Sequence, residues 1–257
     1  MNLKIYNKDC ISGAKKYFDD ESVDLGIYDP PFGINENSFG SQYNRDESNV
    51  IKGYVEAPEN YLDFTRQWLS EATRILKSNG SMYVISDWSL LHDVLIVIKE
   101  LDLFVINHII WKYNFGVFTK KKYVSSHYHM LFLKKSKNAK ITFNTECRFD
   151  PDEKDGKGRS LIYGDLEDVW VINKEYATGK TKNKNKLPEA LVQKMILYSS
   201  NEGDTVCDFF MGNFTTAFVA QKLGRIPRGF ELNKKAFDYH MPLLKWQESS
   251  VLGVEKR

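Results

Sequence analysis

Short apolar runs alternate along the chain with segments in which apolar residues recur at helical spacing. The apolar runs predict strands at 3–6, 23–28, 81–86, 104–111, 129–133, 205–210 and 229–232. The periodic segments predict helices at 61–76, 90–101, 188–199 and 215–223. This alternation indicates an α/β fold with a doubly wound, mostly parallel sheet, here expected to have seven strands.

Two long polar stretches interrupt the alternation. Residues 33–60 are too long for a simple connection, which is typical of a functional loop. Residues 141–185 contain the run DPDEKDGKGR and predict a small insertion. A chain of 257 residues suits one large domain. We therefore expect one domain over 1–257 that contains both the loop and the insertion.

The segment YDPPF, residues 28–32, closes the second predicted strand. Neither proline has an N–H to donate, so sheet pairing must end here. A structural turn would account for the prolines alone. The segment also fixes a carboxylate, rigid carbonyl groups and an aromatic ring together at the end of a strand, which indicates a binding or catalytic site.

A second motif, TVCDFFMGNFTT at residues 205–216, reads as a strand, a glycine turn and the start of a helix. Glycine lets the backbone approach a ligand closely, and free N–H groups at a helix start attract its negative end. Glu231 ends the next predicted strand, where a carboxylate can hold the hydroxyl groups of a ribose. An ordinary βαβ unit is the alternative, and the absence of GxGxxG disfavours a nicotinamide or flavin cofactor.

Taken together and in this order, the two motifs resemble those of beta-class amino-group DNA methyltransferases, which use S-adenosylmethionine. Their catalytic tetrapeptide, D/N/S-P-P-Y/F/W, is similar to DPPF at 29–32, and their cofactor motif is similar to residues 208–216. LGRxxxGFE, residues 223–231, and the pair Asp9-Cys10 also match in order. Phe209 and Phe214 depart from the family pattern, since they replace a usual proline and a usual glycine.

The resemblance implies a Rossmann-like methyltransferase fold and methyl transfer to the N6 amine of a flipped adenine in DNA. It implies that the catalytic residues are Asp29, Pro30, Pro31 and Phe32. In this reading Asp29 and the Pro30 carbonyl accept hydrogen bonds from the amine, and Phe32 stacks on the base. The residues implied for the cofactor are Asp9, Cys10, Asp208, Phe209, Phe210, Gly212, Asn213, Thr215, Thr216 and Glu231.

Charge is distributed unevenly, although the net charge is only +2. Residues 103–145 contain no Asp or Glu but several lysines, and a second basic run, GKTKNKNK, covers 179–186. A solvated face is the alternative, but aromatic residues among the lysines favour a nucleic acid, here double-stranded DNA. The expected phosphate contacts are Lys112, Lys120, Lys121, Lys122, Lys182, Lys184 and Lys186. Sequence recognition is assigned to 141–185, with help from 33–60.

Other readings stay open at this point. The target amine could be N4 of cytosine, the substrate could be RNA, or the chain could be a nucleic-acid-binding protein on a methyltransferase fold without activity. The resemblance also leaves open a homodimer and a cognate restriction endonuclease as partners. Cys10, Cys147 and Cys207 show no metal or disulfide spacing, and no apolar stretch is long enough to span a bilayer. We therefore expect no bound metal, no membrane contact and a cytoplasmic location.

Overall fold

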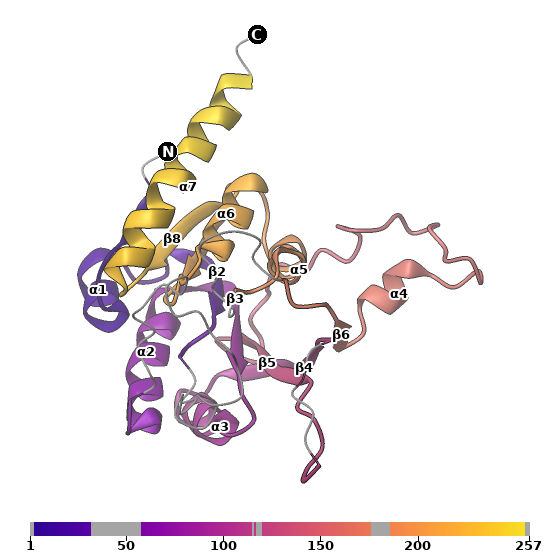
Figure 1. Cartoon of the computed structure of the whole chain (residues 1–257), viewed down its shortest axis with the longest axis horizontal. Coiled ribbons are helices and arrows are strands. Elements are labelled where there is room, and N and C mark those ends of the chain that lie inside the picture. The colour runs from indigo at the N-terminus through magenta and orange to yellow at the C-terminus, as the bar shows by residue number, and fades with distance from the viewer. Residues whose placement is uncertain (1–2, 32–57, 115, 117–119, 176–185, 255–257) are drawn as a thin grey trace.

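The computed structural model describes residues 3–31, 58–114, 116, 120–175 and 186–254. An eight-stranded sheet runs through it in the order β1-β8-β7-β2-β3-β5-β4-β6 (Figure 1). All strand pairings are parallel except those of β5, which runs antiparallel to β3 and β4. The strands are β1 (Lys4–Tyr6), β2 (Val23–Tyr28), β3 (Leu76–Ser86), β4 (Phe104–Lys112), β5 (His127–Lys134), β6 (Val169–Val171), β7 (Thr205–Asp208) and β8 (Ile226–Phe230).

The fold class is confirmed, but the expected number of seven strands is wrong. The additional strand, β6, lies within the polar stretch 141–185 and pairs in parallel with the end of β4. It has only three residues and alternates exposed, buried and exposed, so it gives too short a pattern to detect in the sequence. The expected insertion therefore contributes an edge strand to the sheet.

The four predicted helices are confirmed, and three others were not predicted. The predicted ones are α2 (Tyr61–Ile75), α3 (Leu91–Glu100), α5 (Glu189–Ser199) and α6 (Thr215–Lys222). The others are α1 (Cys10–Tyr17), α4 (Leu161–Asp165) and α7 (Lys234–Val254). The α7 helix contains Pro242 and projects from the body with the C-terminus, and α4 lies on an arm on the opposite side (Figure 1).

Alternate residues of the central strands supply two hydrophobic layers. On β3, Met82 and Val84 pack on the layer with α1, α2 and α3, whereas Tyr83 and Ile85 pack on the layer with α5 and α6. Side chains of a strand point alternately to the two faces of the sheet, so helices cover both faces. This three-layer arrangement leaves the carboxyl ends of the parallel strands as the edge on which a ligand site can form.

One strand begins earlier than its apolar pattern predicts. The sequence signals a helix end at Asn79-Gly80, but α2 ends at Ile75 and β3 starts at once with Leu76. The irregular register between β2 and β3 accommodates the polar residues, since Val23 pairs with Leu76 and Leu25 with Ser81. Lys77 also donates to Asp24 at 2.6 Å, which ties the start of β3 to β2.

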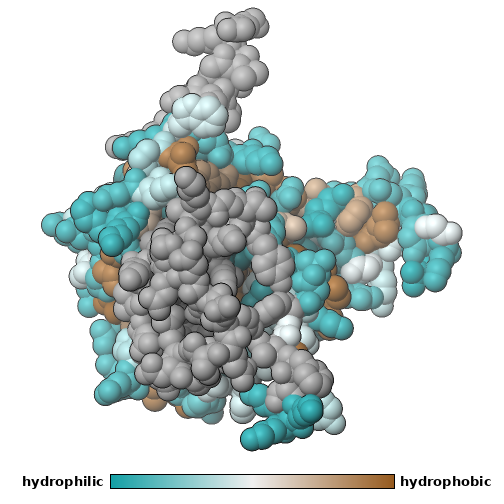
Figure 2. Space-filling model, viewed as in Figure 1, coloured by the Kyte–Doolittle hydropathy of each residue, from teal (hydrophilic) through white to brown (hydrophobic). Residues whose placement is uncertain are grey.

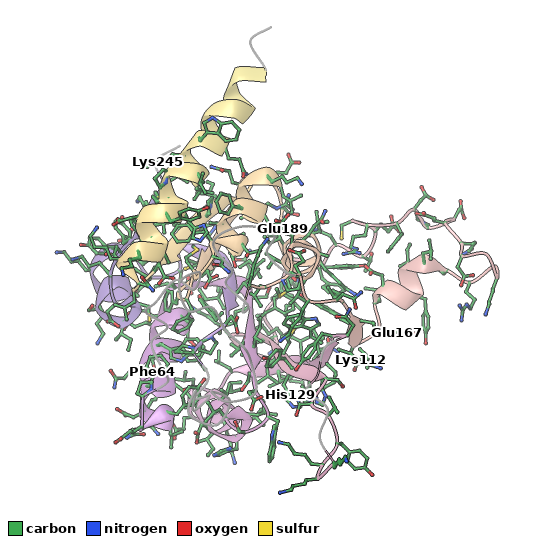
Figure 3. The ribbon with its side chains drawn as sticks, in the orientation of Figure 1. Phe64, Lys112, His129, Glu167, Glu189 and Lys245 are labelled. Atoms are coloured by element: carbon green, nitrogen blue, oxygen red, sulfur yellow. The ribbon has the colours of Figure 1, made fainter. Side chains whose placement is uncertain are left out.

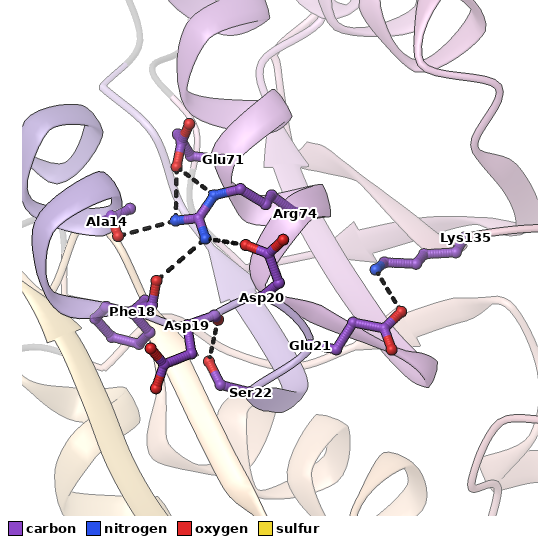
Figure 4. A network of polar contacts seen from close by, with 9 residues as sticks. All are labelled: Ala14, Phe18, Asp19, Asp20, Glu21, Ser22, Glu71, Arg74 and Lys135. Atoms are coloured by element: carbon purple, nitrogen blue, oxygen red, sulfur yellow. Dashed lines mark hydrogen bonds and ion pairs between the residues drawn. The ribbon is translucent and has the colours of Figure 1, made fainter.

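A partly exposed arginine joins the elements that surround β2. Arg74, near the end of α2, donates to the carbonyl oxygens of Ala14 and Phe18 and to the carboxylates of Asp20 and Glu71 (Figure 4). Guanidinium has donors for several acceptors in one plane, so one side chain satisfies the C-terminal carbonyls of α1 and the turn that follows. This network holds the start of β2, and hence the segment that follows β2, in place.

Gly229 permits the closest backbone approach in the sheet, which gives a test of the fold. It pairs with Asp208, has a φ of +148°, and a Cβ there would lie 1.8 Å from the Asp208 carbonyl oxygen. We expect Gly229→Ala to lower the free energy of unfolding by more than about 2 kcal/mol, because both strain and a clash oppose the native strand. Urea unfolding measures the change. Gly156→Ala, with nothing within 4 Å of the new Cβ, is the control and should stay near wild type.

Candidate active site

The DPPF segment and the glycine turn (residues 208–216) meet because β2 and β7 are neighbours. Leu25 pairs with Val206 and Gly26 with Cys207 in a parallel ladder. From β2 the chain continues to one side of the sheet through β3, whereas β7 continues to the other side through β8. The two motifs therefore lie at the point where strand order reverses, the usual place of a ligand cleft in such sheets.

The Asp208 side chain shapes the glycine turn. Its carboxylate accepts a hydrogen bond from the Phe210 amide at 2.8 Å and one from the Thr216 hydroxyl at 2.7 Å. The first bond turns the chain away from β7, so the strand ends at Asp208 and not at the predicted residue 210. The second ties the turn to the first residues of α6. Asp208 is almost fully buried, so it supports this turn from the interior of the protein.

Glu231 lies directly after β8 and reaches back to the same turn. One carboxylate oxygen accepts from the Gly212 amide at 2.6 Å, and the other accepts from the Asn233 amide at 2.6 Å. Gly212 has a φ of +50°, a conformation that glycine adopts without strain. Beside it, the buried Thr215 hydroxyl has no hydrogen-bond partner among the described residues. The N-terminus of α6 thus presents an unsatisfied polar atom at the predicted cofactor position.

The two phenylalanines that depart from the family pattern point into the core. Phe214 has a left-handed backbone, φ 60° and ψ 20°, which is the conformation that the usual glycine would supply. Its ring is fully buried and packs against Phe237 and His240 of α7. Phe209 is buried against Tyr28 and Phe230. Both rings pack in the core, so the two departures keep the left-handed turn and add packing.

Asp9 and Cys10 lie at the end of β1, which pairs with β8 and not with β7. Asp9 caps α1 by accepting the Ser12 amide at 2.9 Å. The Tyr6 carbonyl accepts the Glu231 amide at 3.1 Å, so the end of β1 adjoins the Glu231 side of the glycine turn. Burial and the neighbouring Asp9 raise the pKa of the Cys10 thiol, which keeps it neutral. Asp9 therefore approaches the site across β8.

Two carboxyl groups lie at neighbouring strand ends, that of Asp29 after β2 and that of Asp208 at the end of β7. Burial, and then the charge of Asp208, raise the pKa of Asp29 to about 7. Burial also raises the pKa of Asp208 to about 7, although the Thr216 and Phe210 hydrogen bonds oppose the shift. Burial raises the pKa of Glu231 as well, against the hydrogen bonds from Asn233 and Gly212. Such perturbed groups at a strand-end cleft are typical of functional sites.

A cation that the sequence did not reveal acts on this site. Lys174 partly offsets the shift of Asp29, because its positive charge lowers the pKa of that carboxyl. It comes from the stretch 172–175 that follows β6, and its Nζ lies over the rings of Tyr113 and Tyr128. A single lysine in a polar stretch carries no motif, so only the tertiary structure could identify it.

The predicted phosphate-contacting lysines have different surroundings. Lys112 ends β4, where it lies near His129 of β5 (Figure 3), and Lys120, Lys121 and Lys122 are exposed on the β4–β5 connection. Lys186 instead donates to Glu175 and Glu189, which neutralise its charge. Lys182 and Lys184 lie outside the described residues, as do Phe32 and most of the predicted loop 33–60.

Hydrophilic residues cover most of the described surface on the face shown in Figure 2.

Two histidines lie close together, but they do not belong to a metal site. His108 and His129 make a 2.8 Å hydrogen bond across β4 and β5, but the described residues contain no group of three ligands arranged for a metal ion. All three cysteines are free thiols. Within the described ranges, no helix combines the length and the apolar character that crossing a bilayer requires.

The comparison with protein-family models identifies the chain, because the DNA methylase model matches residues 23–241. The chain belongs to the DNA methylase family. It is 31% identical to the DNA adenine methyltransferase YhdJ of Escherichia coli (strain K12), over 90% of this chain and 79% of that protein. It is 29% identical to the type II methyltransferase M.HpaI of Haemophilus parainfluenzae, over 95% of this chain and 75% of that protein.

Solved structures of DNA methylases share the fold. The PvuII DNA methyltransferase, described as cytosine-N4-specific, has a TM-score of 0.68 at 17% identity, with 95% of this chain and 93% of that chain covered. The complex of M1.HpyAVI with SAM has a TM-score of 0.60 at 20% identity, with 93% and 97% covered. This family membership confirms the resemblance that DPPF and the glycine turn carry in the sequence.

The raised pKa of Asp29 predicts how the stability of this DNA methylase depends on pH. Between about pH 4 and 7 the folded protein binds more protons than the unfolded chain, so stability falls as the pH rises. We expect Asp29→Asn to be more stable than wild type by about 2 kcal/mol at pH 8, and the difference to vanish towards pH 4. Denaturant unfolding at both pH values measures this. Asp150→Asn, which removes an exposed carboxyl group, is the control for loss of a charge. An Asp29→Asn difference independent of pH would contradict the assignment.

Proposed function

We propose that this DNA methylase transfers a methyl group from S-adenosylmethionine to the N6 amine of adenine in double-stranded DNA. The observation that carries the proposal is the meeting of Asp29 and the glycine turn at the ends of β2 and β7. One motif offers acceptors for an amine, and the other offers a polar cradle beside it. Methyl transfer requires the amine and the cofactor to be bound side by side with their reacting atoms aligned, so both motifs are needed.

The residues of the glycine turn fit the proposed cofactor. The unpartnered Thr215 hydroxyl and the start of α6 offer polar groups to its amino-acid end. A carboxylate has about four lone-pair positions, and Glu231 uses two for Gly212 and Asn233, so acceptors remain for ribose hydroxyls. When bound, S-adenosylmethionine supplies a methyl group on a sulfonium, which is a good leaving group.

Asp29 and Pro30 would prepare the amine. The lone pair of an exocyclic amine is delocalised into the base, which makes it a poor nucleophile. The Asp29 carboxylate would accept one N–H and the Pro30 carbonyl the other, so that the nitrogen becomes tetrahedral and its lone pair is exposed. With a pKa of about 7, Asp29 can also take the proton that the nitrogen loses after transfer. Pro31 keeps this turn rigid, and Phe32 would stack on the flipped base.

Adenine is favoured over cytosine as the target. Aspartate at the first position of DPPF is the form that the resemblance associates with adenine, and the relative YhdJ is described as an adenine methyltransferase. The alternative, N4 of cytosine, keeps the same acceptors and the same geometry, and the PvuII enzyme of similar fold is described as specific for that atom.

The remaining parts of the proposal concern DNA and partners. Lys112 and Lys120–Lys122 would contact phosphates, which position the duplex without reading it. Residues 141–185 would contain the sequence reader, supported by the loop 33–60. A cytoplasmic location, a homodimer and a cognate restriction endonuclease complete the expectation, and each stays a prediction.

Product analysis tests the reaction directly. Incubation with methyl-labelled S-adenosylmethionine and mixed-sequence double-stranded DNA, followed by digestion to nucleosides and mass spectrometry, should place the label in N6-methyladenine. Label in N4-methylcytosine would overturn the choice of base and keep the chemistry. Label in RNA supplied to a parallel incubation, with none in DNA, would overturn the substrate. Absence of label together with absence of cofactor binding would favour the non-catalytic alternative.

Two single substitutions separate the roles of the two motifs. We expect Asp29→Ala to reduce kcat by at least about 100-fold, because it removes an acceptor used in the transition state, while cofactor affinity stays near wild type. Glu231→Gln should instead weaken cofactor binding about tenfold, because it removes a charged acceptor. Calorimetry and single-turnover rates measure the two effects. Near-normal turnover by Asp29→Ala would disprove its role.

A further inference from the structure

Lys174 is held in place by two aromatic rings. Its Nζ lies 4.2 Å from the centroid of the Tyr113 ring and 4.8 Å from that of the Tyr128 ring, and the two rings lie 5.3 Å apart. Tyr113 follows β4 and Tyr128 lies on β5, so two elements confine the ammonium group. A cation over a ring face is attracted by the ring's quadrupole, most strongly where water is partly excluded.

The chain is attached to the body of the protein on both sides of Lys174, through the backbone before it and through a side chain after it. The Ile172 amide donates to the Lys112 carbonyl at 3.0 Å, and the Trp111 indole donates to the Ile172 carbonyl at 2.8 Å. On the other side, the Glu175 carboxylate accepts the Glu189 amide at 2.8 Å. The position of Lys174 is therefore a product of the fold and does not depend on a flexible lysine stem alone.

Lys174 and Asp29 lie at the same edge of the sheet, because the strands that precede them, β6 and β2, run in the same direction. From this position the charge of Lys174 acts on Asp29. Among the described residues Lys174 has no ion-pair partner at contact distance, yet its charge favours the ionised form of Asp29, and Asp29 in turn favours the charged form of Lys174. Burial and Asp208 act in the opposite direction on Asp29. The protonation of Asp29 is thus set by burial and the Asp208 carboxylate on one side and by the Lys174 cation on the other.

The other titratable groups around this balance stay neutral near pH 7 or act on it from a distance. Burial raises the pKa of the Tyr28 hydroxyl and of the Cys207 thiol, and both stay protonated. Tyr113 after β4 and Tyr128 on β5 contact Lys174, and Asp208 at the end of β7 acts on Asp29. Behind them, Asp87 after β3 acts on Tyr113, and Cys10 on α1 and Glu231 after β8 interact with Asp208. Within the described residues that act on Asp29, Lys174 is the one cation.

We propose that Lys174 is a positioning residue that keeps the carboxylate of Asp29 charged, so that it accepts a hydrogen bond from the target amine. The inference rests on the proposed role of Asp29 in methyl transfer. A charged acceptor makes hydrogen bonds about twice as strong as a neutral one, whereas a protonated carboxyl would present a donor to the amine's own N–H. Because Lys174 follows β6, correct docking of the stretch 141–185 on the sheet also sets the charge of the site.

The pH dependence of single-turnover methyl transfer tests the inference. We expect Lys174→Gln to move the acidic limb of the rate profile up by about one pH unit, since an opposite charge nearby shifts a carboxyl by about that much or more. Its rate should therefore fall about tenfold at pH 6.5 and approach that of wild type at high pH. Lys174→Arg should retain the wild-type profile, because it keeps the charge over the two rings. Lys99→Gln, an exposed lysine of α3, is the matched control for loss of one charge.

A second readout does not depend on methyl transfer. Carbon-13 NMR of carboxyl-labelled aspartate follows the titration of Asp29, whose signal is the one that Asp29→Asn removes. Its midpoint should rise by about one unit in Lys174→Gln and stay unchanged in Lys174→Arg and Lys99→Gln. If wild type methylates nothing, the proposed function fails, and this titration still decides whether Lys174 controls the charge of Asp29.

Two results would overturn the inference. The first is an Asp29 titration and a rate profile that Lys174→Gln leaves in place. The second is a Lys174→Gln variant with an unshifted profile, a raised KM for DNA and a shallower salt dependence, because that combination describes a phosphate contact. Thermal unfolding of each variant confirms that the folded protein is compared.

Discussion

The site depends on the parallel pairing of β2 with β7, which places two carboxyl groups at neighbouring strand ends. Asp208 supports the glycine turn from below through Phe210 and Thr216, and Asp29 begins the DPPF segment beside it. Burial raises the pKa of both carboxyl groups, and a neighbouring carboxylate adds to each shift, Asp208 for Asp29 and Glu231 for Asp208. The Lys174 cation opposes the rise in the pKa of Asp29, and the hydrogen bonds from Thr216 and Phe210 oppose the rise in the pKa of Asp208.

The surrounding elements hold these strand ends in register. Arg74 joins α1, α2 and the turn before β2, and Gly229 lets β8 approach Asp208 closely. The α7 helix packs on the Phe214 ring and so supports the glycine turn from the C-terminal side. Phe214 therefore keeps the left-handed conformation that a glycine would adopt without strain. The packing of its buried ring offsets the cost of that conformation.

The stretch 141–185 links DNA recognition with catalysis in this reading. Its strand β6 extends the sheet beside β4, and the residues that follow carry Lys174 to the two tyrosines. Tyr113 and Tyr128, which lie among the basic residues of the sequence, thus pack against a lysine of their own chain. An arm that reads DNA and also delivers the cation of the active site would couple its docking to the charge of Asp29.

Local patterns in the sequence determined much of this protein: the α/β class, seven of the eight strands, four helices, and the DPPF and glycine-turn motifs, since each depends on periodicity or on residues close together in the chain. The eighth strand, the early start of β3 and the helices α1, α4 and α7 were not predicted, because short or polar segments take their structure from what they pack against. Lys174 could not be identified from the sequence for the same reason. Its importance comes from Asp29, Tyr113 and Tyr128, which are distant in sequence and become its neighbours only when β6 joins the sheet.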